Sequence, residues 1–232
     1  MNWQQFWDSL AALQDPHAQV GRTGGQGSID QATLACIADY IVATLDIGPG
    51  DTVLDLCCGN GLLTRELARS CAQMIGVDLS PAQIAIARQR HSAANIRYVV
   101  GDVTRLQDLG LPPADKINLY FSFQYLERPA HGGAALAGMA SLLRPGGRML
   151  LGDVPERSRL AVFYPSARQR LGYHLRLALG RSPMGRFWSE AEMQTIAGQQ
   201  GLAVTKLMQP GDLPYAHYRC DYLLWLPGNT RV

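Results

Sequence analysis

The sequence lacks any long hydrophobic run and any marked excess of charge. No apolar stretch among its 232 residues reaches the roughly 20 residues that span a bilayer, so we predict no membrane-spanning helix. The first residues lack the basic start and apolar core of a secretory signal, and we expect none. The formal net charge is only +2, so bulk electrostatics does not require a nucleic-acid partner.

Cysteines are few and show no regular spacing. The five cysteines are an odd number without a disulfide framework, which predicts reduced thiols and a cytoplasmic protein. The adjacent pair Cys57 and Cys58 would bind one metal ion poorly, and we expect no metal site. Internal repeats and low-complexity segments are also missing, so the chain is interpreted as one domain with a sizeable core.

What the sequence does contain is a short apolar run followed by two closely spaced glycines. The run from Val53 to Leu56 predicts a buried strand, and leucines at helical spacing predict a helix from Leu62. Gly59 and Gly61 lie between them, where a side chain would block the approach of a ligand to the backbone. Strand, glycine turn and helix form the opening of a nucleotide-binding βαβ unit.

The ligand expected at this turn is not a dinucleotide, because Thr64 stands where the pattern Gly-x-Gly-x-x-Gly needs its third glycine. Asp55, on the strand before the turn, is suited to face an ammonium group. Asp78, at the end of the next strand, lies at the distance expected of a carboxylate that binds both ribose hydroxyls. The free N–H groups at the helix start suit a carboxylate. S-adenosylmethionine has an amine, a carboxylate and a ribose, and it fits this set.

Four short motifs follow one another between residues 50 and 155. They are Asp55–Gly61, Ile75–Ser80, Tyr98–Val103 and Leu142–Arg148. Together they resemble the motifs of class I S-adenosylmethionine-dependent methyltransferases. The chain departs from that pattern at two places, because Cys57 replaces an often-seen glycine and Asn118 replaces an acid that often begins the fourth strand's motif.

The resemblance implies a site for S-adenosylmethionine, with S-adenosylhomocysteine as the product. Asp78 would bind the ribose, Asp102 the adenine amine and Arg22 the methionine carboxylate. Arg22 also has the alternative of an ordinary solvated loop arginine. The other residues implied to bind the cofactor lie in the motifs or at the end of the fourth strand: Asp55, Cys57, Gly59, Asn60, Gly61, Leu79, Val103 and Phe121.

The catalytic residues are less clearly marked. Methyl transfer is an in-line displacement, so the enzyme chiefly aligns the partners and excludes water. A hydroxyl or ammonium acceptor also loses a proton, and histidine is the usual base near neutral pH. The candidates are Tyr125, His131 and His217, in loops expected at strand ends, and a structural or solvent-exposed role stays open for each histidine.

Alternating strand and helix patterns predict an α/β fold with a parallel sheet and helices on both faces. The resemblance makes it a Rossmann-like, seven-stranded, mostly parallel sheet with an antiparallel last strand. Residues 1–46 are expected to form N-terminal helices and a lid, with a flexible loop at residues 21–27. Residues 50–155 would form the cofactor-binding core, residues 156–188 an inserted helical lid over the substrate after the fifth strand, and residues 189–232 the final helix and strand pair.

Absent motifs favour a small-molecule acceptor. Residues 118–121 lack the prolines by which adenine N6 methyltransferases resemble one another, and no RNA-binding module fits in this length. We expect transfer to an oxygen or nitrogen of a specialised-metabolite or sugar-type acceptor, with no nucleic-acid or membrane partner and with a homodimer left open. Three alternatives remain. The first is a non-catalytic cofactor-binding scaffold. The second is an RNA or protein methyltransferase using the nine arginines from Arg144 to Arg186 as a phosphate-binding patch. Those arginines could equally form a solvated helix face. The third, implied by the resemblance, is an enzyme that uses the cofactor for cyclisation instead of methylation.

Overall fold

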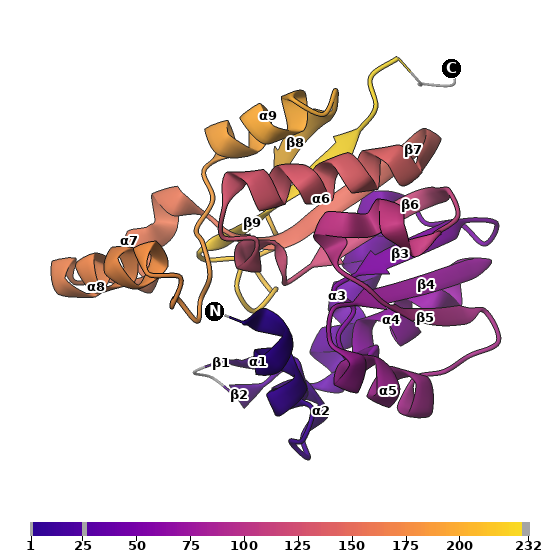
Figure 1. The fold of residues 1–232 in the computed structure, drawn as a ribbon, viewed down its shortest axis with the longest axis horizontal. Helices are drawn as coiled ribbons and strands as arrows, with labels where there is room; N and C mark the ends of the chain where they lie inside the picture. Colours follow the sequence, from indigo (N-terminus) through magenta and orange to yellow (C-terminus); the bar gives the residue numbers. More distant parts are fainter. Residues whose placement is uncertain (1, 25–26, 229–232) are drawn as a thin grey trace.

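The computed structural model describes residues 2–24 and 27–228. Its centre is a seven-stranded sheet in the order β5-β4-β3-β6-β7-β9-β8 (Figure 1). The five strands from β5 to β7 are parallel, and β9 is antiparallel to both β7 and β8, which confirms the predicted sheet. The strands are β3 Thr52–Leu56, β4 Gln73–Asp78, β5 Ile96–Val100, β6 Ala114–Tyr120, β7 Leu143–Pro155, β8 Ala203–Leu207 and β9 Arg219–Trp225.

Helices cover both faces of the sheet (Figure 1). The helices α3, α4 and α5 pack on one face, and α6, α9 and the 3-10 helix η2 pack on the other. Their bounds, with the short 3-10 helices between them, are α3 Gln31–Leu45, α4 Leu62–Leu67, η1 Ala68–Ser70, α5 Pro81–Arg90, η2 Val103–Leu109, η3 Phe123–Tyr125, α6 Pro129–Leu142 and α9 Glu190–Gly198. None of the described helices combines the length and hydrophobicity needed to cross a bilayer.

Burial of both sheet faces explains the apolar strands. Successive side chains of a strand point to opposite faces. Val53 accordingly packs with α3 and α4, whereas Leu54 and Leu56 pack in the core beneath α6 and α9. A strand covered on both sides reads as a continuous hydrophobic run instead of an alternating one.

Side-chain caps set the start of three helices. Asp30 accepts a hydrogen bond from the Thr33 N–H at the start of α3, and Ser80 caps α5 directly before a proline at its first position. Ser189 and Glu192 form a reciprocal capping box at the start of α9. These local hydrogen bonds fix where the chain leaves the strand ends, and so they help to position the loops there.

The segment before α3 differs from the expected helix and flexible loop. It contains α1 Trp3–Leu10, α2 Pro16–Gln19 and a small hairpin, in which β1 Thr23–Gly24 pairs with β2 Gly27–Ser28. The expectation of a loop at residues 21–27 is corrected at positions 23, 24 and 27, which pair as strands of this hairpin. Residues 25 and 26 lie outside the described residues.

Residues 156–188 leave the sheet after β7 and return to it before α9. They contain η4 Arg157–Arg159, α7 Leu160–Phe163 and α8 Ala167–Ala178. At the base of this insert, the Trp188 N–H donates to the Pro155 carbonyl and the Arg157 N–H donates to the Trp188 carbonyl, each at 2.8 Å. Trp188 is fully buried in the main core. The insert is thus anchored at its base, while α8 lies at the outer edge of the molecule (Figure 1).

Candidate active site

The turn after β3 has a left-handed backbone at Cys57, Gly59 and Gly61, whose φ angles are 57°, 56° and 83°. A Cβ added to Gly59 would lie 2.7 Å from Cγ1 of Val20. A Cβ added to Gly61 would lie 2.6 Å from the Tyr98 hydroxyl oxygen. Packing of the turn against its neighbours therefore requires these glycines, in addition to their backbone conformation.

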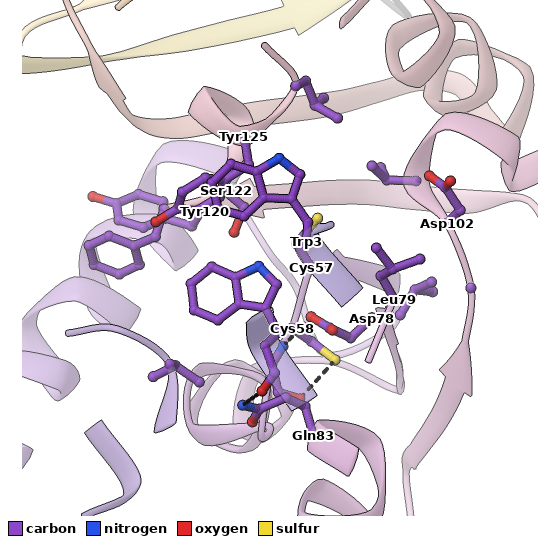
Figure 2. Close-up of a pocket in the computed structure, with 18 of the residues that line it drawn as sticks. Trp3, Cys57, Cys58, Asp78, Leu79, Gln83, Asp102, Tyr120, Ser122 and Tyr125 are labelled. Atoms are coloured by element: carbon purple, nitrogen blue, oxygen red, sulfur yellow. Dashed lines mark hydrogen bonds between the residues drawn. The ribbon is translucent and has the colours of Figure 1, made fainter. Parts of the chain in front are cut away.

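A cavity of about 320 Å³ lies at the carboxyl ends of β3, β4, β5 and β6, next to the N-terminal helices. This is the edge at which open α/β sheets bind ligands, and the volume suits a small molecule. Most residues predicted to bind the cofactor line it: Arg22, Cys57, Gly59, Asp78, Leu79, Asp102, Val103 and Phe121. In Figure 2 the carboxylates of Asp78 and Asp102 lie on one side of the view, and Tyr120 and Ser122 lie on the other.

Asp78 ties together the ends of β3 and β4. Its Oδ2 accepts a hydrogen bond of 2.8 Å from the Gly59 N–H, and its Oδ1 accepts one of 2.9 Å from the Ser80 N–H. Burial raises the pKa of this carboxyl group to about 6, although the two hydrogen bonds favour its charged form. At neutral pH the cavity wall therefore carries a buried, ionised carboxylate.

Arg22 is a buried cation with unused donors. Only 9% of its surface is exposed, and its Nε and Nη1 have no hydrogen-bond partner among the described residues. Its guanidinium carbon lies 4.4 Å from the centre of the Phe121 ring. Burial lowers the pKa of Arg22 to about 10, which leaves it charged at neutral pH. A buried guanidinium with free N–H groups in a cavity wall is suited to bind an anion. The structure thus excludes the alternative of a solvated loop arginine.

Asp102 directly precedes the 3-10 helix η2 and caps its start. Its Oδ1 accepts hydrogen bonds from both the backbone N–H and the hydroxyl of Thr104, each at 2.8 Å. These bonds hold the carboxylate at the end of β5, in the cavity wall. Asp102 is therefore oriented by its own turn, without help from distant parts of the chain.

Helix α1 covers part of the cavity with aromatic rings. The Tyr125 ring centre lies 4.6 Å from that of Trp3 and 5.3 Å from that of Trp7. Asp8 of α1 accepts hydrogen bonds from the Ser80 hydroxyl and, at 3.4 Å, from the Ala82 N–H at the start of α5. The N-terminal helix is thus docked on the start of α5 by polar contacts, and its tryptophans line the cavity.

Three predicted cofactor residues do not line the cavity. Both carboxylate oxygens of Asp55 are occupied, because one accepts from the Thr64 hydroxyl at 2.6 Å and the other from Asn118 Nδ2 at 2.8 Å. Asn60 Nδ2 donates to the Pro16 carbonyl at 2.8 Å, and so joins the turn to α2. Asp55, Asn60 and Gly61 are instead buried or packed within the turn that supports the cavity. The expectation that Asp55 faces a bound ammonium group is corrected accordingly.

The predicted catalytic residues also differ in whether they line the cavity. Tyr125 and His131 line the cavity, whereas His217 is exposed on the loop before β9, with its ring 4.8 Å from that of Tyr218. No residue of the segment 156–188 lines the cavity. The insert therefore does not form the expected lid over this site.

Several lining residues were missed by the sequence analysis: Val20, Gln83, Thr104, Tyr120 and Ser122. Ser122 and Thr104 could have been inferred, since each closely follows a residue expected at a strand end. Phe121, between Tyr120 and Ser122, has a φ of 65°, which is rare for a bulky side chain. Such outliers concentrate at functional sites, where surrounding structure offsets the strain.

Comparison with known proteins relates the chain to methyltransferases. The family model described as a methyltransferase domain matches residues 53–147. The chain is 26% identical over 213 residues to a ubiquinone biosynthesis O-methyltransferase of Azorhizobium caulinodans, covering 88% of this chain and 78% of that protein. It is 31% identical over 163 residues to a demethylmenaquinone methyltransferase of Mycobacterium sp. strain KMS, covering 69% and 67%. It spans about half, 46%, of a Xanthomonas oryzae ubiquinone biosynthesis O-methyltransferase, at 34% identity.

Two solved structures share the fold. The N-methyltransferase NodS of Bradyrhizobium japonicum, in complex with S-adenosylhomocysteine, matches with a TM-score of 0.68 and 20% identity, over 98% of this chain and all of NodS. The magnesium protoporphyrin IX methyltransferase of Synechocystis, also with S-adenosylhomocysteine bound, matches with a TM-score of 0.62 and 20% identity, over 95% and 92%. At these identities the likeness concerns the fold alone. Together with the sequence relationship to the mycobacterial enzyme, this common fold makes the chain a member of the class I S-adenosylmethionine-dependent methyltransferases, with S-adenosylmethionine as its cofactor.

Proposed function

We propose that this methyltransferase acts on an oxygen or nitrogen atom of a small-molecule acceptor, by in-line displacement. The names of three relatives refer to small molecules, namely ubiquinone, demethylmenaquinone and magnesium protoporphyrin IX. The observation that carries the proposal is the combination, in one cavity, of two carboxylates, an unpaired buried guanidinium and a cover of aromatic rings. The rings offer flat apolar surfaces to an acceptor.

The lining residues fit the cofactor chemically. In our assignment Asp78 accepts hydrogen bonds from the ribose hydroxyls, Asp102 accepts from the adenine amine, and Arg22 donates to the methionine carboxylate. A carboxylate beside Arg22 would satisfy buried donors that otherwise lack partners, and leaving such donors unpaired costs about 1–3 kcal/mol. Residues 1–46, which supply Arg22 and the two tryptophans, serve in this proposal as the lid of the site.

S-adenosylmethionine supplies an electrophilic methyl group attached to a positively charged sulfur. The chain's own residues align the acceptor with it and exclude water. Burial raises the pKa of Tyr125, so its phenol stays protonated at neutral pH and can donate a hydrogen bond but cannot act as the base. His131 is then the lining side chain suited to take a proton from the acceptor.

Two experiments test the function. Calorimetric titration with S-adenosylhomocysteine measures whether the cavity binds the cofactor product. Labelled S-adenosylmethionine, incubated with panels of phenols, amines and sugars and separately with RNA and with protein, then measures methyl transfer to each class. Transfer to RNA or protein but to none of the small molecules would contradict the proposal.

Replacing Arg22 with methionine is expected to weaken S-adenosylmethionine binding about 100-fold, since a charge-assisted hydrogen bond contributes about 1.5–3 kcal/mol. Calorimetry checks the dissociation constant. Arg22→Lys keeps the charge but not the planar pair of donors. Its dissociation constant should therefore lie between those of the wild type and Arg22→Met. If Arg22→Met bound the cofactor as tightly as the wild type, the carboxylate assignment would be wrong.

Replacing His131 with glutamine is expected to lower kcat by a factor of about 100 to 1,000 without changing cofactor affinity, since general-base catalysis contributes on this scale. Initial rates with a confirmed acceptor measure the effect. His217→Gln is the matched control, because His217 is exposed outside the cavity, and its kcat should be unchanged. Equal losses in both variants would count against a specific role for His131.

A further inference from the structure

The outward face of α8 is apolar and exposed. Leu171, Leu175 and Leu179 follow one another at four-residue spacing, which places them on one side of the helix. They are 62%, 57% and 67% exposed. Val162 of the neighbouring α7 adds a fourth exposed apolar side chain, at 54%. Leu179 directly follows Ala178, the last residue of α8, so the three leucines form a stripe of about 12 Å along the C-terminal part of the helix.

Positive charge surrounds this leucine face, and negative charge is missing from it. Residues 157–189 contain seven arginines and no aspartate or glutamate. The arginines at the base of the insert, Arg157, Arg159 and Arg186, pair with glutamates outside that range. Arg168 and Arg176 of α8 lie exposed beside the leucines, and Arg181 follows just after the helix. The tip of the insert is therefore both apolar and cationic.

The opposite face of α8 is held firmly. Tyr173 is 2% exposed, and its hydroxyl accepts a hydrogen bond of 2.9 Å from the Phe187 N–H. With Leu160 and Tyr218 these two residues form a separate hydrophobic cluster between the insert and the start of β9. The leucine face thus belongs to a helix fixed in orientation, whose outer side has no partner within the described chain (Figure 1).

We propose that α8 docks this enzyme onto the anionic surface of a phospholipid bilayer. The leucines would enter the boundary between headgroups and acyl chains, and Arg168, Arg176 and Arg181 would bind the phosphates. This combination of an apolar stripe and flanking arginines is typical of helices that lie in the plane of a membrane surface. The proposal does not depend on which acceptor is methylated.

Charge favours this occupant over the alternatives. A second copy of the chain, packed by two-fold symmetry, would bring the arginines of one α8 against those of the other. A nucleic acid would match the arginines but would leave three leucines against a charged backbone. An anionic bilayer has phosphates at its surface and apolar acyl chains beneath them. The arginines beside the leucine face can bind the phosphates while the leucines enter the apolar layer.

The insert also adjoins the cavity wall. The Arg186 N–H donates to the Gln124 carbonyl at 2.8 Å, and a Cβ on Gly185 would lie 2.3 Å from the same oxygen. Gln124 belongs to η3, whose next residue, Tyr125, lines the cavity. A bilayer bound by α8 would therefore hold this wall of the active site close to the membrane surface.

Co-sedimentation of the full chain with vesicles tests the proposal. We expect binding to vesicles of phosphatidylglycerol and phosphatidylcholine in equal parts, and at least about tenfold weaker binding to phosphatidylcholine alone. The triple variant R168Q/R176Q/R181Q should bind the anionic vesicles at least about tenfold less tightly, because each arginine near such a surface contributes about fivefold. The triple variant L171Q/L175Q/L179Q should lose affinity to a similar degree.

A matched control removes three exposed arginines elsewhere. The variant R90Q/R97Q/R148Q has the same net charge as the arginine variant but an unchanged α8, and it should bind like the wild type. Cofactor binding and melting temperature report that every variant is folded.

Three results would overturn the proposal. The first is no sedimentation with anionic vesicles. The second is an equal loss of affinity for anionic vesicles in the control and in the α8 variants. The third is a wild-type dimer, seen by light scattering, that the leucine variant dissociates, because the leucine face would then belong to a second copy of the chain.

Discussion

Replacing Asp78 with asparagine is expected to weaken the binding of S-adenosylmethionine and S-adenosylhomocysteine by about 100-fold or more. The carboxylate is assigned to two ribose hydroxyls, and hydrogen bonds to a buried charge contribute about 1.5–3 kcal/mol each. The same oxygens accept from the N–H groups of Gly59 and Ser80, and an amide at position 78 can accept only at its oxygen. Calorimetric titration of both ligands measures the loss.

The pH dependence of this variant provides a second measurement. Burial raises the pKa of Asp78 to about 6, above its ordinary value near 4. The folded, ligand-free protein therefore holds this proton more tightly than the unfolded chain does. The stability from this group is fully present below about pH 4 and is lost as the pH rises through about 6.

Asp78→Asn should accordingly gain in melting temperature, relative to the wild type, as the pH rises from 4 to 7. Cofactor affinity of the wild type should rise over the upper part of that range, as the carboxylate ionises, and the variant should lack this rise. Asp78→Glu keeps the charge but moves the carboxylate by one methylene group. It therefore separates the effect of the charge from the effect of its position. A variant that binds within about twofold of the wild type would contradict the ribose assignment.

Replacing Arg219 with methionine is expected to lower the free energy of unfolding by about 3–5 kcal/mol, the usual cost of leaving one partner of a buried ion pair alone. Arg219 Nη1 donates to Asp153 Oδ2 and to the Asp153 carbonyl, each at 2.7 Å. Both residues are less than 10% exposed. The guanidinium also lies over the rings of Tyr215 and Tyr218, at 5.3 and 5.0 Å from their centres.

Thermal and urea unfolding measure this effect. For a domain of this size we expect the melting temperature to fall by about 6–20 °C. Burial already raises the pKa of Asp153 with Arg219 present. The unpaired carboxyl should then take up a proton, so the loss should be smaller at pH 5 than at pH 8.

The double variant Arg219→Met, Asp153→Asn should recover part of the stability, because it removes both charges, and asparagine tolerates the φ of 58° at this position. If Arg219→Met lowered the free energy of unfolding by less than about 1 kcal/mol, the ion pair would have to be accessible to solvent.

The local signals in the sequence brought most of the predicted cofactor residues to one cavity. The predicted residues at strand ends, such as Asp78, Asp102 and Phe121, line one cavity because parallel strands end at one edge of the sheet. The signals were less reliable inside the glycine turn. Asp55 accepts hydrogen bonds from Thr64 and Asn118, and Asn60 donates one to α2. Buried polar groups need hydrogen-bond partners, and these two residues find theirs within the fold instead of at the cavity.

The expectation of no membrane partner depended on a test for membrane-spanning helices alone. That test looks for about 20 consecutive apolar residues. The leucines of α8 are spaced four residues apart among arginines, so they do not form such a run. Their exposure follows from the packing of Tyr173 and Leu177 on the opposite face of the helix. The proposed surface docking follows from that tertiary arrangement.

The sequence by itself determined the class of this enzyme and the alternation of strands and helices along its core, because these depend on motifs and hydrophobic patterns of residues close in the chain. Tertiary structure alone decided which polar side chains reach the cavity, how the N-terminal tryptophans enclose it and which face of α8 stays exposed. It also assembled the Arg219–Asp153 pair, whose residues lie 66 positions apart. Such pairings carry no local pattern, since each results from competition among distant groups for burial and hydrogen bonds once the sheet has formed.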